Sequence, residues 1–189
     1  MTVPELYVLR HGETEWNREG RLQGHHDSPL TEEGRAQAAR QHRILAGRDL
    51  SGFTFHLSPL GRCLQTAGIA LGGIAGLART DDRLMEIGVG EWETRLRADL
   101  AAEGLIPGAA DDPALYQDAP GGEGFSGLEV RCRSFLSDLD GPAVIVTHGI
   151  TSRMLRSLAL ARDPLELLGL PGGQGNVFHI ADGRSEELR

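Results

Sequence analysis

The chain has 189 residues, 40% of them hydrophobic, and a formal net charge of −8. This length fits about one domain of roughly 150 residues, so we expect a single domain spanning residues 1–189. No apolar run approaches the ~20 residues that cross a bilayer, which argues against a membrane protein. The negative charge argues against a nucleic-acid partner, because that binding needs a broad positive surface.

The chain also lacks the pattern of a secretory signal, since no basic region followed by an apolar stretch stands near its start. The two cysteines, Cys63 and Cys132, are expected to be reduced thiols. We therefore expect a cytoplasmic protein. All 19 lysine-plus-arginine positions are arginine, which removes lysine from every candidate mechanism.

Strand patterns alternate with helical patterns along the chain, which predicts a three-layer α/β/α sandwich with a mainly parallel central sheet. Thr31 is a predicted helix start and Gly47 its predicted stop. Ser58 and Pro59 are a predicted N-cap and first-turn pair for the helix after the second strand. In chain order, the predicted elements are a strand over residues 6–9, a helix over 31–47, a strand over 53–57, a helix from 58 to about 71, a strand over 77–80, helices over 96–103 and 128–139, a strand over 143–147, a helix over 150–161, and a last strand over 176–180 with a turn at 182–183.

Two of the predicted strands end in a histidine followed by a glycine. The first strand runs into Arg10, His11 and Gly12, and the strand over residues 143–147 runs into His148 and Gly149. Parallel strands of an open α/β sheet bind ligands outside their carboxyl ends. Both histidines therefore face one crevice if the two strands are neighbours.

These residue types suit the splitting of a phosphate ester. The reaction needs an in-line nucleophile, cations that neutralise the equatorial oxygens, and an acid that protonates the leaving oxygen. His11 is the candidate nucleophile, since a neutral imidazole can accept the phosphoryl group as phosphohistidine. Arg10 and Arg62 carry planar, permanently charged groups that suit bidentate contacts to phosphate. His148 is a candidate hydrogen-bonding partner of the phosphoryl group.

Several ordered segments of the chain follow the signature of a known family. They are Arg10-His11-Gly12-Glu13-Thr14 with Asn17, Arg21-Leu22-Gln23-Gly24, Asp27-Ser28-Pro29-Leu30-Thr31, Ser58-Pro59-Leu60 with Arg62 and Thr66-Ala67, Leu84-Met85-Glu86-Ile87 with Trp92-Glu93, and Val146-Thr147-His148-Gly149. Together these segments resemble the histidine phosphatase superfamily, also called the phosphoglycerate-mutase-like family, and within it the small phosphatase branch. Thr94 and Ile150 depart from the family, which often has glycine at these positions.

The resemblance implies a catalytic set and a substrate-binding set. The catalytic set is His11 as the phosphorylated residue, Arg10 and Arg62 as phosphate ligands, Glu86 as proton donor, and His148 as the second histidine. The substrate-binding set adds Asn17, Gln23, Gly24 and Gly149 to the two arginines. Two alternatives stay open: Glu13 is a competing proton donor, and Asn17 serves equally well as a turn-capping residue.

We expect no metal and no cofactor, because arginine charge takes the place of a divalent cation. The run His25-His26-Asp27 is expected to be an exposed loop, since adjacent histidines point in different directions and no fourth ligand stands at a useful spacing. Residues 95–124 carry a weak pattern rich in Gly, Ala and Asp, and they form the predicted lid or specificity insert.

The expected function is a metal-independent phosphomonoester hydrolase that acts on a small phosphorylated metabolite through phosphohistidine. A phosphoglycerate mutase is the first alternative, but the mutase branch resembles longer chains with a larger insert and a substrate-binding lysine. Here Glu86 and His148 stand 62 positions apart and lysine is absent. A protein phosphohistidine phosphatase and an inactive phosphate-binding regulatory module are further alternatives. The substrate stays open among sugar phosphates, phosphoglycolate-like acids, nucleotides and a cobalamin-pathway phosphate, as does the oligomeric state.

Overall fold

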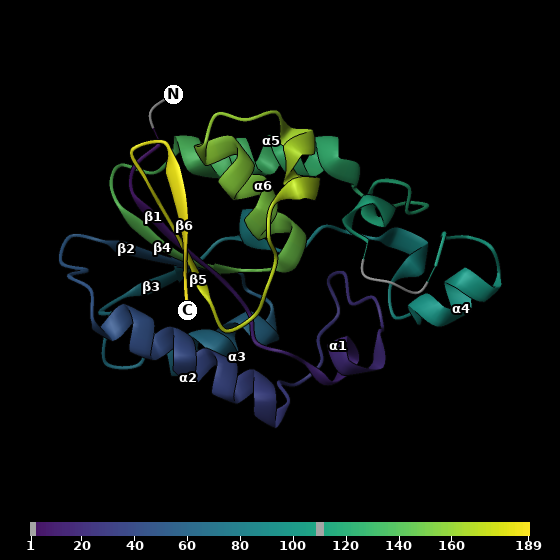
Figure 1. Cartoon of the computed structure of the whole chain (residues 1–189), viewed down its shortest axis with the longest axis horizontal. Coiled ribbons are helices and arrows are strands. Elements are labelled where there is room, and N and C mark those ends of the chain that lie inside the picture. Colours follow the sequence, from purple (N-terminus) through teal and green to yellow (C-terminus); the bar gives the residue numbers. More distant parts are fainter. Residues whose placement is uncertain (1–2, 109–111) are drawn as a thin grey trace.

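The computed structural model describes residues 3–108 and 112–189, and these residues form one six-stranded sheet between two layers of helices (Figure 1). The strands are β1 (Leu6–Arg10), β2 (Thr54–Leu57), β3 (Ala78–Thr80), β4 (Ala143–Thr147), β5 (Val177–Ala181) and β6 (Arg184–Leu188). The helices are α1 (Glu15–Glu19), α2 (Glu32–Ala46), α3 (Gly61–Ala70), α4 (Arg97–Ala102), α5 (Gly124–Ser137) and α6 (Gly149–Ala159), with 3-10 turns η1 (Asp82–Leu84), η2 (Gly90–Trp92), η3 (Pro113–Gln117) and η4 (Pro164–Gly169). The predicted three-layer architecture is confirmed.

The sheet is mainly parallel, in the order β3-β2-β4-β1-β5-β6. Strands β1, β2, β3 and β4 run parallel, whereas β5 is antiparallel to β1 and the edge strand β6 is antiparallel to β5. The parallel pair β1 and β4 is in register from Leu6 opposite Ala143 to Arg10 opposite Thr147. The two histidine-bearing strands are therefore neighbours that end at the same edge, which is the condition under which the sequence places both histidines at one crevice.

Strand β1 is buried on both faces, which explains why it reads as a continuous apolar run. Leu6 and Val8 join the core beneath α5 and α6, while Tyr7 and Leu9 join the core beneath α2 and α3. Figure 1 shows these two pairs of helices on opposite faces of the sheet. The period of two along the strand thus divides its side chains between the two cores.

The start of α3 differs from the prediction. The helix begins at Gly61, and its N-cap residue Leu60 offers no side-chain hydrogen bond, so Ser58 is not the cap. The carboxylate of Asp27 accepts hydrogen bonds from the backbone amides of Gly61 (2.7 Å) and Arg62 (3.2 Å) instead. A residue distant in sequence satisfies the amides that a local N-cap normally takes.

The predicted start of α2 is confirmed, because the Thr31 side chain accepts a hydrogen bond from the amide of Gly34 and the helix ends before Gly47. Helix α1, strand β6 and the 3-10 turns of the described residues escaped prediction. Helix α1 has only five residues, and β6 is an edge strand with a charged sequence that hides its alternation. Helix α5 also begins at Gly124, four residues before the predicted start at Leu128.

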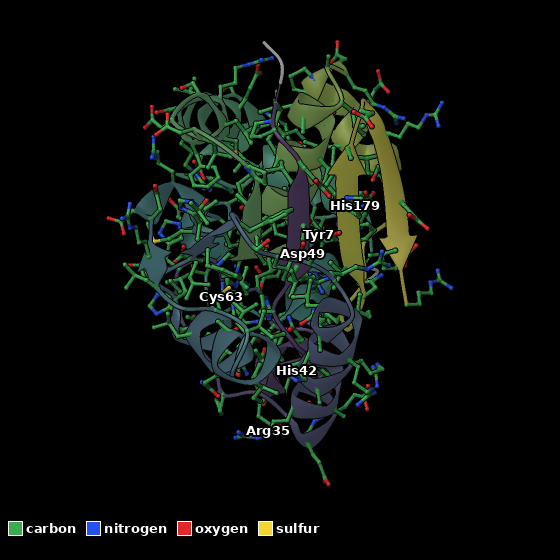
Figure 2. The ribbon with its side chains drawn as sticks, turned by 90° about the vertical axis from the view of Figure 1, so that its left-hand side faces the viewer. Tyr7, Arg35, His42, Asp49, Cys63 and His179 are labelled. Carbon is green, nitrogen blue, oxygen red and sulfur yellow. The ribbon has the colours of Figure 1, made fainter. Side chains whose placement is uncertain are left out.

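His179, the histidine of β5, packs against an aromatic ring and contacts a carboxylate. His179 stacks on Tyr7 of the neighbouring β1 with ring centroids 4.5 Å apart, and Figure 2 labels both residues on this face. Its Nε2 lies 2.6 Å from a carboxylate oxygen of Glu5. His179 therefore connects β5 to β1 and to the segment before it.

The predicted insert over residues 95–124 lies beyond the end of the sheet, where α4 and η3 form its described parts (Figure 1). Residues 109–111 of this insert lie outside the described residues. Among the helices of the described residues, none is long and apolar enough to cross a membrane.

The loop after β1 packs against the first turn of α2 without room for a methyl group. A Cβ on Gly34 would lie 2.0 Å from the backbone oxygen of Glu13, whereas a Cβ on Gly68 of α3 would meet nothing within 4 Å. We expect Gly34→Ala to lower the free energy of unfolding by about 1–3 kcal/mol through overpacking. The control Gly68→Ala should raise it by about 0.5–1 kcal/mol, since alanine favours helix interiors. Urea denaturation measures both, and equal effects would contradict the close approach.

Candidate active site

A pocket opens at the carboxyl ends of β1 and β4 and gathers most of the predicted site. It contains about 350 Å³ of space free of protein atoms, part of it open to solvent. Seven predicted residues line it, namely Arg10, His11, Asn17, Gln23, Gly24, Arg62 and Glu86. Four further residues complete its lining, namely Arg21, Leu22, Arg97 and Tyr116. The pocket therefore joins segments from the start and the middle of the chain.

His11 follows β1 directly and is almost fully buried, with 3% of its surface exposed. Its ring Nδ1 lies 2.7 Å from the backbone oxygen of Gly12, and because that oxygen can only accept, Nδ1 carries the hydrogen. The lone pair is then on Nε2. Burial, followed by the positive charges of Arg62 and Arg10, holds the pKa of His11 well below its usual value. The ring is thus neutral at physiological pH, the form that a nucleophile requires.

Arg10 lies against the start of α6. A Cβ on Gly149 would lie 3.2 Å from Cζ of Arg10, so the glycine allows the guanidinium to pass close to the backbone. The Nε of Arg10 is buried and has no hydrogen-bond partner among the described residues. A buried, charged donor without a partner is costly, and an anionic oxygen in the pocket would satisfy it.

Arg62, the second residue of α3, is buried with 1% of its surface exposed. The loop before α2 holds its guanidinium: Nη1 donates to the His26 backbone oxygen (2.6 Å) and to Asp27 Oδ1 (2.9 Å), and Nη2 donates to the Gly24 oxygen (2.9 Å). Its Nε donates to Nδ1 of His148 (3.2 Å). Four of the five N–H groups are thereby used, which leaves one on Nη2 for a ligand.

His148 lies beside His11, with ring centroids 5.2 Å apart and planes at 62°. Since its Nδ1 accepts from Arg62, its Nε2 carries the hydrogen and donates to Oγ of Ser58 (2.7 Å). Burial, followed by the charge of Arg62, lowers the pKa of His148 well below its usual value. Both ring nitrogens therefore bind protein groups, and His148 lies behind the pocket wall rather than in its lining.

The two candidate acids have different surroundings. The carboxylate of Glu86 lies at the N-terminus of α6, where Oε1 accepts from the amide of Thr151 (3.1 Å) and Oε2 from the amide of Ile150 (3.3 Å). Glu13 instead accepts a hydrogen bond from Oγ1 of Thr31 (2.8 Å), outside the pocket lining. The geometry places Glu86, and not Glu13, where a leaving group could reach it.

The predicted ligand residues Asn17, Gln23 and Gly24 also line the pocket, whereas Gly149 does not. Oδ1 of Asn17 accepts from the amide of Thr14 (3.2 Å) in a capping box and from Nε2 of Gln174 (3.2 Å), so the capping interpretation is confirmed and Asn17 also lines the pocket. Nε2 of Gln23 donates to Oγ1 of Thr14 (2.9 Å). Gly24 has a φ of +51°, in the left-handed region that favours glycine.

The described residues contain no group of three or more His, Cys, Asp or Glu side chains arranged to hold a metal ion. In the loop of His25, His26 and Asp27, the His25 ring contacts the backbone oxygen of Glu86 (3.0 Å) and the His26 ring contacts the carboxylate of Glu93 (3.2 Å). Asp27 binds the start of α3 and Arg62. Each side chain of this loop thus binds a different part of the structure.

Comparison with known proteins agrees with this geometry. The family model described as histidine phosphatase superfamily (branch 1) matches residues 6–186. The chain belongs to the histidine phosphatase superfamily. This histidine phosphatase is 36% identical to a glucosyl-3-phosphoglycerate phosphatase of Mycolicibacterium vanbaalenii, over 95% of this chain and 84% of that protein. It is 34% identical to a "Probable phosphoglycerate mutase GpmB" of Enterobacter sp., over 88% and 76%.

Solved structures of the family have the same fold. A mycobacterial glucosyl-3-phosphoglycerate phosphatase complexed with VO3 gives a TM-score of 0.81 at 27% identity, over 97% of this chain and 96% of that chain. The alpha-ribazole phosphatase of Shigella flexneri gives 0.79 at 26% identity, over 98% and 94%. The family and its phosphatase members identify this chain as an enzyme, a phosphomonoester hydrolase that acts on a small phosphorylated metabolite.

Sequence reasoning missed several contacts of the site. Ser58 matched the family but was interpreted as a helix cap, whereas it binds His148. Tyr116 lies in a weakly patterned segment and gave no signal. Thr94, noted only as a departure from a family glycine, has a φ of +68°, and its backbone oxygen accepts a hydrogen bond from Nη1 of Arg21 (2.6 Å). The glycine common in the family thus corresponds to a left-handed backbone that this chain adopts with threonine.

The low pKa values of His11 and His148 link folding to pH. Below about pH 6.5 an unfolded histidine binds a proton that the folded one does not. The free energy of unfolding is therefore retained above this pH and falls as pH is lowered, by up to about 1.4 kcal/mol per pH unit for each histidine. Urea denaturation from pH 7.5 to 5.5 should show a steeper loss for the parent than for His11→Gln, by about 1 kcal/mol between pH 6.5 and 5.5. Identical slopes would mean that His11 titrates normally in the folded protein.

Proposed function

We propose that the enzyme hydrolyses its phosphate ester through a covalent phosphohistidine on His11. The observation that carries the proposal is the neutral His11 ring, whose Nε2 keeps its lone pair in a pocket where Nε of Arg10 is buried without a partner. A phosphoryl group there would give Arg10 its missing acceptor and would bring phosphorus to the nucleophile. Both groups are therefore poised for the same ligand.

The proposed reaction has two displacements. In the first, Nε2 of His11 bonds to phosphorus, the ester P–O bond breaks, and the leaving oxygen takes a proton from the carboxyl group of Glu86. In the second, water attacks the phosphohistidine, Glu86 takes a proton from that water, and inorganic phosphate leaves His11 unmodified. Arg10 and Arg62 neutralise the phosphoryl oxygens in both steps. His148 is proposed to hold Arg62 in place through the Nδ1 contact, which is an indirect role.

The pocket charges support a substrate with a second anionic group. Four arginines line the pocket. Arg10 and Arg62 are assigned to the phosphoryl group, which leaves Arg21 and Arg97 for a second anionic group. Nη2 of Arg97 donates to the hydroxyl of Tyr116 (2.9 Å), which places both side chains on the wall contributed by the insert. We propose a phosphorylated hydroxy acid or its glycoside, the kind of compound that the name glucosyl-3-phosphoglycerate phosphatase describes for the mycobacterial relative.

A mutase activity is the second candidate, because relatives at 34% identity carry a mutase name. Against it stand the absence of lysine and the short separation of Glu86 and His148.

We also propose that residues 1–189 form one domain, supported by a family match over residues 6–186, and that no metal takes part. A reducing, cytoplasmic location is supported by Cys63 and Cys132, which are both free and buried.

Trapping of the intermediate tests the proposal. Brief incubation with a ³²P-labelled phosphate ester, followed by alkaline quench, should give an acid-labile phosphopeptide that contains His11. His11→Ala should lose the adduct and reduce turnover by at least about 10³-fold. Chelator should leave turnover unchanged. An acid-stable adduct, or one that maps to His148, would overturn the assignment, and isomerisation of 3-phosphoglycerate without release of phosphate would identify a mutase instead.

The role of Glu86 predicts a dependence on the leaving group. An alkoxide needs a proton as it leaves, whereas a nitrophenolate does not, and general acid catalysis contributes about 10²–10⁴-fold. Glu86→Gln should therefore reduce hydrolysis of an alkyl phosphate by about 10²-fold or more and that of nitrophenyl phosphate by less than about tenfold. The matched variant Glu13→Gln should show no such difference between substrates. The reverse pattern would move the proton donor to Glu13.

A further inference from the structure

A second pocket, which we call the loop pocket, lies beside the catalytic pocket but shares none of its lining residues. It contains about 650 Å³ of space free of protein atoms, part of it open to solvent. Its lining consists of Arg40 from α2, the loop residues Gly172, Gly173, Gln174, Gly175 and Asn176, and Glu187 and Arg189 at the end of β6. The established chemistry of the enzyme uses none of these side chains.

The loop pocket has two guanidinium groups, those of Arg40 and Arg189, in a protein of net charge −8. Nη2 of Arg40 donates to Glu33 (2.8 Å), while Nε and Nη2 of Arg189 donate to Glu187 (3.1 and 3.2 Å). A guanidinium has five N–H groups, so both arginines keep donors for a ligand. Such donors favour an anion with oxygen acceptors.

The loop itself adds backbone donors. The amides of residues 172–175 donate no hydrogen bond to any other described residue. Gly173 and Gly175 have φ values of +139° and +84°, and a Cβ on Gly175 would lie 2.9 Å from Nη2 of Arg40. Glycines with unpaired amides next to a guanidinium form the kind of concave surface that binds anions in proteins.

Asn176 specifies a further feature of the ligand. Its side chain is buried, with 8% of its surface exposed, and its Nδ2 donates to Glu187. The opposite atom, Oδ1, is buried without a hydrogen-bond partner among the described residues. This acceptor requires a donor, which an anion alone does not supply but a hydroxyl group does.

Two glutamines connect the loop pocket to the nucleophile. Nε2 of Gln174 donates to the backbone oxygen of His11 (3.2 Å). Nε2 of Gln41 donates both to the backbone oxygen of Asn176 (3.0 Å) and to that of Arg10 (2.9 Å). Any shift of the loop therefore reaches the two residues that hold and attack phosphate, and a 1 Å displacement at such residues can change rates by about 10²-fold.

We propose that the loop pocket binds a small anion that carries a hydroxyl group, either a hydroxycarboxylate or a phosphate ester, and that the bound anion changes the turnover rate at His11. The ligand acts as an effector, because it changes the position of the loop without entering the catalytic pocket. Its carboxylate or phosphate binds Arg40, Arg189 and the loop amides, and its hydroxyl donates to Oδ1 of Asn176, an atom that becomes accessible only when the loop shifts.

Two unreactive probes distinguish a hydroxycarboxylate ligand from a phosphate ester ligand. D-glycerate represents the hydroxycarboxylates, and the phosphonate analogue of glycerol 3-phosphate represents the phosphate esters. Calorimetric titration should show binding of at least one probe, and nitrophenyl phosphate turnover in its presence should change in kcat by about twofold or more with a smaller change in KM. Propionate, which lacks hydroxyl groups, should bind about tenfold more weakly than D-glycerate.

The arginines provide the matched variants. Arg40→Gln with Arg189→Gln should weaken binding of the probe by about tenfold or more and remove its effect on kcat. The control Arg35→Gln removes an exposed arginine of α2 that does not line the pocket (Figure 2). This variant should retain both the binding of the probe and its effect on kcat. Absence of binding at about 10 mM of either probe, binding that the double variant retains, or an effect confined to KM would overturn the proposal. Turnover without probe reports on the catalytic mechanism separately.

Discussion

The pocket end of this protein depends on the hydrogen bonds that hold the buried guanidinium of Arg62. A charge taken out of water is tolerated only where acceptors surround it, and here they come from the loop over residues 24–27 and from His148. Asp27 also holds the first amides of α3, so one carboxylate both starts the helix and neutralises the arginine on it. Through these bonds α3, β4 and the loop before α2 are fixed relative to one another.

The same buried charge determines the state of both histidines. Arg62 lies close enough to disfavour protonation of His11 and His148, and burial acts in the same direction. Its Nε also selects the tautomer of His148, while the Gly12 backbone selects that of His11. A permanently charged residue is needed for this, because a lysine could respond to burial by losing its proton. The cation that suits phosphate thus also keeps the proposed nucleophile neutral.

The sequence predicted the architecture and most of the pocket because both depend on local patterns. Apolar runs that end in Arg10-His11-Gly12 and Thr147-His148-Gly149 mark buried parallel strands, and the family signature supplied Arg62 and Glu86. What could not be predicted depends on pairs distant in sequence. The cap of α3 is Asp27, more than thirty positions away, and Ser58 binds a histidine ninety positions later. No local pattern encodes such pairs, so the sequence assigned Ser58 to the helix that follows it.

His11, the proposed nucleophile, is also positioned from its backbone. Carbonyl oxygens of Arg10 and His11 accept hydrogen bonds from Gln41 and Gln174, so the strand end is held by side chains from α2 and from the loop before β5. A strand end has carbonyls that the sheet no longer pairs, and amide side chains satisfy them at little conformational cost once helix and loop are in place. The reactive ring is therefore oriented by residues that never contact the phosphoryl group. Because one of these supports belongs to a glycine-rich loop rather than to a helix, it is the support that a small ligand can move most easily.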